Sequence, residues 1–201
     1  MESKLKSIRV FSDDWLTPLP IDTLFDKVQP LEIDLGCGKG RFLLARAARF
    51  PDVNFFGIDR MLRRIRKVDR KAVRQGLANI RLMRMEGYYA VSYLVPAGSV
   101  KTYYIFFPDP WPKKRHHDHR LFNAQFMDAL HRTMGPQGCV HFATDHLPYY
   151  EEVKALVKQD RRFEEIETFE PTEEERTDFE RYYIEKTPIG RFSFQKRDKS
   201  S

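Results

Sequence analysis

Asp109 and Trp111 lie in a short segment whose side chains could hold a flat, polar group attached to phosphates. The segment runs from Phe106 to His117 as FFPDPWPKKRHH. Its three prolines, at positions 108, 110 and 112, each fix their own φ and push the preceding residue toward extended geometry. Cationic or titratable side chains occupy every position from Lys113 to His117. We therefore expect a rigid loop that presents a carboxylate, an indole and a row of phosphate-binding groups.

A second group of functional residues surrounds a glycine-rich turn. Asp34 lies two residues before this turn, which has a G-x-G-x-G pattern made by Gly36, Gly38 and Gly40. Glycine allows a sharp backbone turn and lets a ligand approach the main chain closely. Asp59 ends the next apolar segment, where a carboxylate could accept hydrogen bonds from a ribose diol. The turn and this acid together predict a nucleotide-like cofactor.

The glycine spacing and the preceding acid indicate which cofactor this is. A dinucleotide fold uses G-x-G-x-x-G to place a helix N-terminus against a pyrophosphate. Asp34 would repel a pyrophosphate but could hold a cationic amino acid moiety, which favours S-adenosylmethionine. Glu86, after the third apolar segment, is placed to reach an adenine. For Asp34, Asp59 and Glu86 alike, the alternative is a capping or surface role.

An alternating set of elements is expected to bring these residues together. Apolar segments rich in β-branched or aromatic residues, which we expect to be strands, lie at 31–35, 53–58, 80–83, 100–107, 140–143, 163–169 and 189–195. Helix-like segments lie between most of them, at 41–50, 61–75, 88–95, 121–134 and 147–159. The fourth of these is expected to stop at Gly135-Pro136. Such alternation favours an α/β fold with a mostly parallel sheet covered on both faces.

Composition and charge limit the classes of function. The length of 201 residues fits one domain, and we expect residues 1–30 to form an N-terminal appendage to a domain over 31–201. No apolar run reaches membrane-span length, and neither a secretory signal nor a disulfide or zinc spacing of Cys37 and Cys139 is found. We therefore expect a cytoplasmic protein.

The charges are distributed unevenly along the chain. Residues 60–84 hold ten Lys or Arg against the single acid Asp69, whereas residues 151–180 hold twelve acids against five bases. This asymmetry indicates a polyanion that approaches one side of the molecule. A pair of solvated helix faces would give the same pattern.

Five motifs occur in a fixed order along the chain. They are DLGCGKG from Asp34, GID from Gly57, FPDPWPKKRH from Phe107, ATD from Ala143 and TDFE from Thr177. Together they resemble the bacterial tRNA (guanine-N7)-methyltransferases over roughly residues 30 to 197. The resemblance implies a class I methyltransferase, a Rossmann-like three-layer sandwich with a mostly parallel seven-stranded sheet. It also implies that S-adenosylmethionine is used to methylate a guanine in the tRNA variable loop.

The resemblance implies roles for particular residues. Cofactor contacts would come from Asp34, Gly36, Gly38, Gly40, Asp59, Glu86 and Asp109. Substrate contacts would come from Lys113, Asp145, Thr177, Asp178, Phe179 and Glu180. The implied partner is tRNA, and we expect no membrane, no obligate protein partner and a monomer or homodimer.

The chain departs from the family at several of these positions. The family usually has Glu where this chain has Asp34 and Asp59, and usually Asp or Asn where it has Glu86. These exchanges keep the charge but alter the reach by one methylene. The family also tends to continue with Lys and Arg after His116, whereas this chain has His117, Asp118, His119 and Arg120.

Methylation at guanine N7 makes limited demands on acid–base chemistry, because N7 has a lone pair and no proton. The enzyme mainly has to align N7, the methyl carbon and the sulfur at near-attack distance. Carboxylates near the ring would accept hydrogen bonds from N1–H and the exocyclic amine and would stabilise developing positive charge. Asp109 is the expected catalytic residue, with Asp145 as a second carboxylate at a strand end.

The other side chains of the proline-rich segment have more than one interpretation. Trp111 could stack on the base or pack beneath its own loop. Lys113, Lys114 and Arg115 suit phosphate contacts, which give affinity but little sequence choice. The histidines at 116, 117 and 119 lack nearby cysteines or clustered acids, so we expect phosphate or backbone contacts and no metal. The basic helix over 60–74 is a candidate second RNA surface.

Three other functions fit the sequence less well. An amino-methyltransferase would share an Asp-Pro-Pro-aromatic type of loop, but the WPKKR continuation and the TDFE motif disfavour it. A non-catalytic RNA-binding or chaperone module would not need acids at three strand ends. An NAD-dependent dehydrogenase is disfavoured by the glycine spacing and by Asp34.

Overall fold

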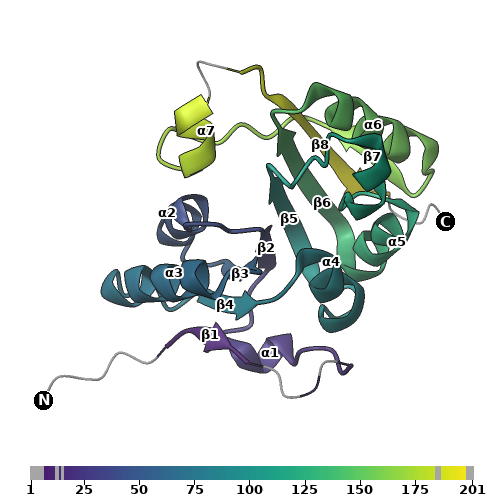
Figure 1. Ribbon diagram of the computed structural model, residues 1–201. Coiled ribbons are helices and arrows are strands. Elements are labelled where there is room, and N and C mark those ends of the chain that lie inside the picture. Colours follow the sequence, from purple (N-terminus) through teal and green to yellow (C-terminus); the bar gives the residue numbers. More distant parts are fainter. Residues whose placement is uncertain (1–6, 12–13, 15, 184–186, 198–201) are drawn as a thin grey trace, which may run out of the picture.

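Over the described residues the sheet has eight strands, one more than the seven expected, in the order β1-β4-β3-β2-β5-β6-β8-β7. Figure 1 shows their arrangement. The computed structural model describes residues 7–11, 14, 16–183 and 187–197. The first six strands pair in parallel, and β8 runs antiparallel to β6 and β7. The strands are β1 (Arg9–Val10), β2 (Leu31–Leu35), β3 (Asn54–Asp59), β4 (Ile80–Arg84), β5 (Val100–Phe106), β6 (Met134–Thr144), β7 (Phe163–Ile166) and β8 (Gly190–Lys196). The expected α/β class and the mostly parallel sheet are confirmed.

The eighth strand comes from the N-terminal part of the chain. β1 pairs with β4 in parallel, with Arg9 opposite Leu82. A two-residue strand is too short to show an alternating pattern, so its position depends on the edge of β4 rather than on its own sequence. Downstream of it, Leu19, Ile21 and Phe25 are buried in the core. The division at residue 30 stays a prediction, and parts of the expected appendage (1–6, 12–13 and 15) lie outside the described residues.

Helices cover both faces of the sheet (Figure 1). α2 and α3 pack on one face through a cluster that includes Leu43, Phe55 and Val68, and the remaining buried side chains form a larger cluster. The helices are α1 (Ile21–Leu24), α2 (Arg41–Arg49), α3 (Leu62–Arg74), α4 (Gly87–Tyr89), the π-helix η1 (Ala90–Leu94), the 3₁₀-helix η2 (Lys114–His119), α5 (Ala124–Thr133), α6 (Leu147–Gln159) and α7 (Asp178–Tyr183). Within the described ranges, no helix is both long and apolar enough to cross a bilayer.

α5 differs from its expected boundaries at both ends. It begins at Ala124 because the Asn123 side chain accepts a hydrogen bond from the backbone N–H of Phe126, at 2.9 Å. It ends at Thr133, one residue before the expected end, so the helix does stop ahead of Gly135-Pro136. Both residues belong to β6, where the pairing with β5 is irregular between Val100 and Thr102. A proline is tolerated at such a bulge because no ladder hydrogen bond is lost there.

The strand order reverses between β2 and β5, which are neighbours in the sheet. Chain connections run outward from this pair in both directions, toward β3 and β4 on one side and toward β6 on the other. All five residues of β2 are buried, as expected for a parallel strand covered on both faces. Open α/β sheets bind ligands beyond the carboxyl ends of strands at such a reversal.

Candidate active site

A cleft of about 690 Å³ opens beyond the carboxyl ends of β2, β3, β4 and β5. It brings together residues from four separate segments, among them Gly36, Asp59, Glu86, Asp109, Trp111 and Arg120. The cleft therefore lies at the reversal of strand order and joins Gly36 and Asp59 to Asp109 and Trp111. Asp34, Gly38, Gly40 and Lys113 do not line it.

The glycine turn forms one wall of the cleft and has the backbone that only glycine adopts readily. Gly36, Gly38 and Gly40 have φ values of 89°, 55° and 76°. A Cβ atom on Gly36 would meet nothing within 4 Å, so the main chain there is open to a ligand. A Cβ atom on Gly40 would lie 2.6 Å from both methyls of Val68. The first glycine thus gives access to the backbone, and the third allows α2 to start against α3.

Asp34 is a buried carboxylate with no hydrogen-bond or ion-pair partner in the described part of the chain. It lies in β2 with 5% of its surface exposed, opposite Gly57 of β3. Burial, with a smaller contribution from the charge of Asp59, raises the pKa of Asp34 to about 8. Such a group is costly when ionised and gains most from a cation that reaches it.

Asp59 connects the glycine turn to α3. Its carboxylate accepts hydrogen bonds from the backbone N–H of Gly38 at 3.0 Å and of Met61 at 2.7 Å. The guanidinium of Arg64 lies 3.3 Å from the same group. The side chain lines the cleft but is only 4% exposed as a residue. A ribose contact stays a prediction, and the contacts seen here hold the turn in place.

Glu86 caps the short helix α4. Its two carboxylate oxygens accept hydrogen bonds from the backbone N–H groups of Tyr88 and Tyr89, both at 2.9 Å. The residue is exposed and lines the cleft. The capping role considered as an alternative is therefore present, and an adenine contact stays a prediction.

Asp109 lines the same cleft as Gly36 of the glycine turn. Its carboxylate is 65% exposed and pairs with Arg60 at 3.5 Å, itself 68% exposed. Exposed pairs of this kind contribute little to stability. The carboxylate is therefore available to a ligand in the cleft.

The proline-rich loop is anchored at its start and carries backbone conformations that are unusual for bulky residues. Phe107 and Trp111 have φ values of 54° and 43°. The Phe107 N–H donates to the Ala143 carbonyl at 2.7 Å, which ties the loop to the end of β6. Trp111 packs against His119, with ring centroids 5.1 Å apart, and also lines the cleft. Both roles considered for Trp111 are therefore compatible with its position.

Arg120 is a buried residue that anchors this loop through backbone carbonyls. It was not among the expected site residues. It is 4% exposed, and its guanidinium donates to the carbonyls of Pro110 at 2.8 Å and Trp111 at 3.4 Å. It also pairs with Glu152 and lies over the ring of Tyr149 at 5.0 Å. In the sequence it is one more base after a basic run, so nothing marked it as buried.

The expected substrate residues lie around the cleft rather than in it. Asp145 directly follows β6, and Lys113 is exposed at the end of the proline-rich loop. The TDFE segment forms the start of α7, where the Thr177 hydroxyl accepts from the Glu180 N–H at 3.0 Å. Phe179 packs on Phe107 with centroids 4.6 Å apart. α7 therefore contacts the proline-rich loop.

Glu180 has surroundings that differ from those of a surface contact residue. It is 1% exposed and pairs with Arg191 of β8 and, at 3.7 Å, with Arg176. Burial raises the pKa of Glu180, and the two arginines oppose that shift. One of its carboxylate oxygens, Oε2, is buried without a hydrogen bond. Its contact with a substrate stays a prediction, as do those of the other residues.

Similarity to characterised proteins identifies the family. A family model described as "Putative methyltransferase" matches residues 28–187. The tRNA (guanine-N(7)-)-methyltransferase of Nitrosococcus oceani is 35% identical over 164 residues, which cover 81% of this chain and 70% of that protein. The protein of the same name from Nocardia farcinica is 37% identical over 69% of this chain and 52% of its own length. This chain belongs to the tRNA (guanine-N7)-methyltransferase family.

Solved structures agree with this family at the level of the fold. The 16S rRNA methyltransferase KamB has a TM-score of 0.63 and 14% identity, with 89% of this chain and 93% of that chain covered. The fold of this tRNA (guanine-N7)-methyltransferase family member is thus that of a class I methyltransferase.

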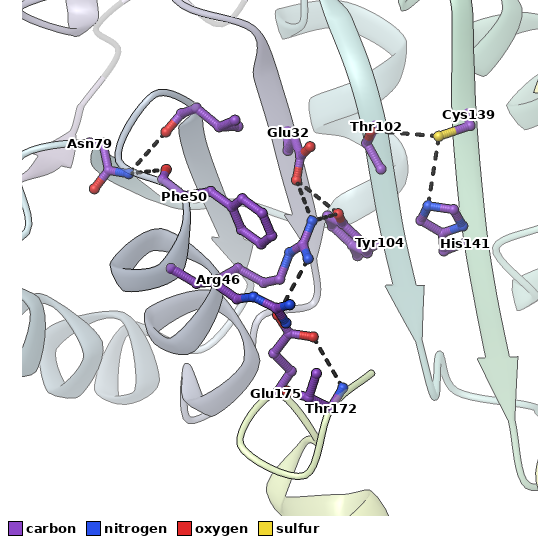
Figure 2. A network of polar contacts seen from close by, with 12 residues as sticks. Glu32, Arg46, Phe50, Asn79, Thr102, Tyr104, Cys139, His141, Thr172 and Glu175 are labelled. Atoms are coloured by element: carbon purple, nitrogen blue, oxygen red, sulfur yellow. Dashed lines mark hydrogen bonds and ion pairs between the residues drawn. The ribbon is translucent and has the colours of Figure 1, made fainter. Parts of the chain in front are cut away.

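A polar network beside α2 is a further feature of this family member (Figure 2). Arg46 of α2, with its side chain 12% exposed, donates to Tyr104 at 2.8 Å and lies 3.4 Å from Glu32 and 3.3 Å from Glu175. Glu175 is 2% exposed and also accepts from the Thr172 N–H at 3.1 Å. The network joins α2, which follows the glycine turn, to the segment that leads into α7.

Proposed function

We propose that the protein transfers a methyl group from S-adenosylmethionine to N7 of a guanine in the variable loop of tRNA, in the cytoplasm. The observation that carries the proposal is that Asp109 and Gly36 of the glycine turn line one cleft. Two relatives that carry this activity in their names are aligned over most of the chain. The enzymatic activity and its substrate therefore have support from geometry and from similarity.

The residues of the cleft fit the cofactor. Asp34 is a buried carboxylate two residues before the turn, and no cation pairs with it in the described part of the chain. It would hold the ammonium of the amino acid part, while the open backbone at Gly36 would let the ligand approach. Asp59 and Glu86 line the cleft and would face the nucleoside part. When bound, S-adenosylmethionine supplies an electrophilic methyl group on a positively charged sulfur.

The protein's own contribution is positioning and charge. Guanine N7 needs no base, so the side chains have to hold the purine in line with the methyl group. Asp109 would accept from N1–H and the exocyclic amine and would stabilise the positive charge that the methylated purine acquires. Phe107 and the prolines fix the position of this carboxylate, and Arg120 holds the loop carbonyls from the protein side. Lys113 would bind a phosphate next to the base.

Product analysis tests the proposal. The protein is incubated with bulk tRNA and labelled S-adenosylmethionine, and the RNA is then treated with cleavage chemistry specific for N7-methylguanosine. We expect cleavage at one guanine of the variable loop and N7-methylguanosine in the nucleoside mass spectrum. A label on an exocyclic amine would assign the protein to amino methylation instead. No label in any tRNA would overturn the proposal.

A further inference from the structure

One face of α3 carries a stripe of cations that no carboxylate in the described part of the chain pairs with. The stripe consists of Arg63, Arg66, Lys67, Arg70 and Arg74, all exposed. Their spacing of three, four, seven and eleven residues from the first places them on one side of the helix. The stripe is about 17 Å long at ~1.5 Å per residue. Like charges at this spacing repel one another, so the stripe favours an anionic partner.

The other charged residues of α3 already have partners within the protein. Arg64 pairs with Asp59, and Lys71 donates to the Lys39 carbonyl at 3.2 Å. Asp69 is 7% exposed and accepts from the Ile8 N–H at 3.1 Å, with the Arg9 guanidinium at 2.8 Å. The single acid of the helix is therefore used to attach β1 and does not neutralise the stripe.

The attachment of β1 creates a groove beside the stripe. A hollow of about 680 Å³ lies between β1, β4 and α3. Ile65 and Met83 form apolar lining, Arg66 and Arg84 supply positive charge, and Phe11 is 75% exposed at the β1 side. A second hollow, of about 660 Å³, continues along Arg63, Arg66 and Arg70. Apolar and aromatic surface next to cations suits a nucleic acid strand, which offers bases as well as phosphates.

The groove adjoins the cleft described above. Arg60, Met85 and Glu86 line both. A strand that places a guanine in the cleft would therefore continue over the groove. We propose that the groove and the α3 stripe bind the RNA strand that flanks the methylated guanine, with phosphates on Arg63, Arg66 and Arg70 and a base stacked on Phe11. This inference rests on the proposed function for the position of the guanine.

The test compares two triple charge reversals in the full-length protein. The first, R63E/R66E/R70E, reverses three of the five cations of the stripe. The matched control, K101E/K158E/R161E, reverses three exposed bases that lie outside both hollows and the cleft. Binding of a labelled tRNA transcript is measured without cofactor at several salt concentrations. Affinity for S-adenosylmethionine is measured by calorimetry, and methylation is followed separately.

We expect the stripe variant to bind tRNA at least tenfold more weakly and to lower the slope of log K against log salt by about two. Its affinity for S-adenosylmethionine should stay at the wild-type value. F11A should lower tRNA affinity about tenfold with the salt slope unchanged, because stacking releases no counterions. The control triple variant should bind tRNA nearly as tightly as the wild type.

Four results would decide the matter differently. Equal losses of tRNA affinity in the two triple variants would mean that only net charge matters for binding. That result would overturn the proposed RNA-binding role of the groove. Wild-type tRNA affinity in the stripe variant, with methylation intact, would overturn the RNA-binding role of the groove but not the proposed function. A wild type that binds tRNA through the stripe but yields no N7-methylguanosine would overturn the proposed function and the placement of the guanine, but not RNA binding by the stripe. Wild-type protein that binds no RNA would overturn both.

Discussion

α2 and α3 lie on the same face of the sheet and both carry several arginines, yet the protein treats their charges in opposite ways. Two of the three arginines of α2 meet carboxylates, since Arg46 lies beside Glu32 and Glu175, and Arg49 also pairs with Glu175. The α3 stripe meets none in the described residues. The same contrast separates the acids, because Glu175 is paired whereas Asp34 is buried with no partner among the described residues. Buried, paired charges hold the fold together, whereas charges that are unpaired or only in an exposed ion pair are left for ligands.

The largest effect is expected at an acid that the fold does not need. Replacing Asp109 by Ala should lower kcat/KM for tRNA about 10³-fold, because hydrogen bonds aimed at developing charge are worth roughly 4 kcal/mol. The melting temperature should stay within about a degree of the wild type, since an exposed ion pair contributes little. Steady-state kinetics and thermal unfolding measure the two quantities.

A matched control exists for this variant. Asp128 of α5 is 66% exposed and pairs with Arg162 at 2.7 Å, much as Asp109 is 65% exposed and pairs with Arg60. Replacing Asp128 by Ala should leave kcat/KM unchanged. Near-normal turnover of D109A would mean that Asp109 does not act on the substrate or the cofactor.

Replacing Glu175 by Ala should have the opposite profile. Breaking a buried ion pair leaves an uncompensated charge and typically costs about 3 kcal/mol or more. Urea unfolding should show that loss, while the salt dependence of tRNA binding should not change. The neighbouring exposed E174A is the control, with an expected change below about 0.5 kcal/mol. A stability loss in E175A no larger than that of E174A would contradict the division into paired and unpaired charges.

Much of the fold and of the cleft could be predicted from the sequence. The limits of β2 and α6 match those expected, because a buried parallel strand and an amphipathic helix have strong local patterns. The cleft-lining Asp59, Glu86 and Asp109 were found because each follows a strand. β1 and Arg120 could not be predicted, since their roles depend on an edge strand and on buried loop carbonyls that are distant in sequence. The pairing of Glu175 with Arg46 likewise depends on the tertiary fold. In the sequence, Glu175 is only one of three consecutive acids.

Asp34 connects cofactor binding to pH. Its pKa of about 8 means that binding a cation must first ionise the carboxyl below that pH. Affinity for S-adenosylmethionine should therefore rise between pH 6 and 8, by at most about tenfold per unit, and level off above. D34N should bind roughly 30-fold more weakly at pH 8, in line with the loss of a charge-assisted hydrogen bond, and should show a flat profile. Calorimetry across this pH range measures both.

The same variant should change stability in the opposite direction. An acid whose pKa is raised by folding stabilises the native state at low pH, and that contribution is lost as the pH rises toward about 8. D34N avoids this loss, so it should melt a few degrees above the wild type at pH 8.5. If D34N lost both stability and cofactor affinity at this pH, Asp34 would have a role in holding the fold together.

The smallest effect concerns His141, a base inside the paired region. Burial, with a smaller contribution from the charge of Arg46, lowers the pKa of His141 to about 4. The ring stacks on Phe169 at 4.7 Å and its Nδ1 lies 2.8 Å from the Ser193 hydroxyl, so the neutral form is the one that the fold accommodates. The unfolded chain takes up a proton near pH 6.5 and the folded chain only near pH 4, so stability falls as the pH drops between these values.

Between pH 7 and pH 5 this should cost the wild type about 1–2 kcal/mol of unfolding free energy. His141→Gln should remove that part of the acid sensitivity even if its stability at pH 7 is lower, because glutamine has no proton to gain. The exposed His119→Gln should keep the wild-type profile and serves as the control. Urea unfolding at the two pH values measures the difference. An equal fall in unfolding free energy in the wild type and in His141→Gln would mean that a protonated His141 is tolerated beside Arg46. The charges around Arg46 and Glu175 would then be less tightly balanced than their ion pairs indicate.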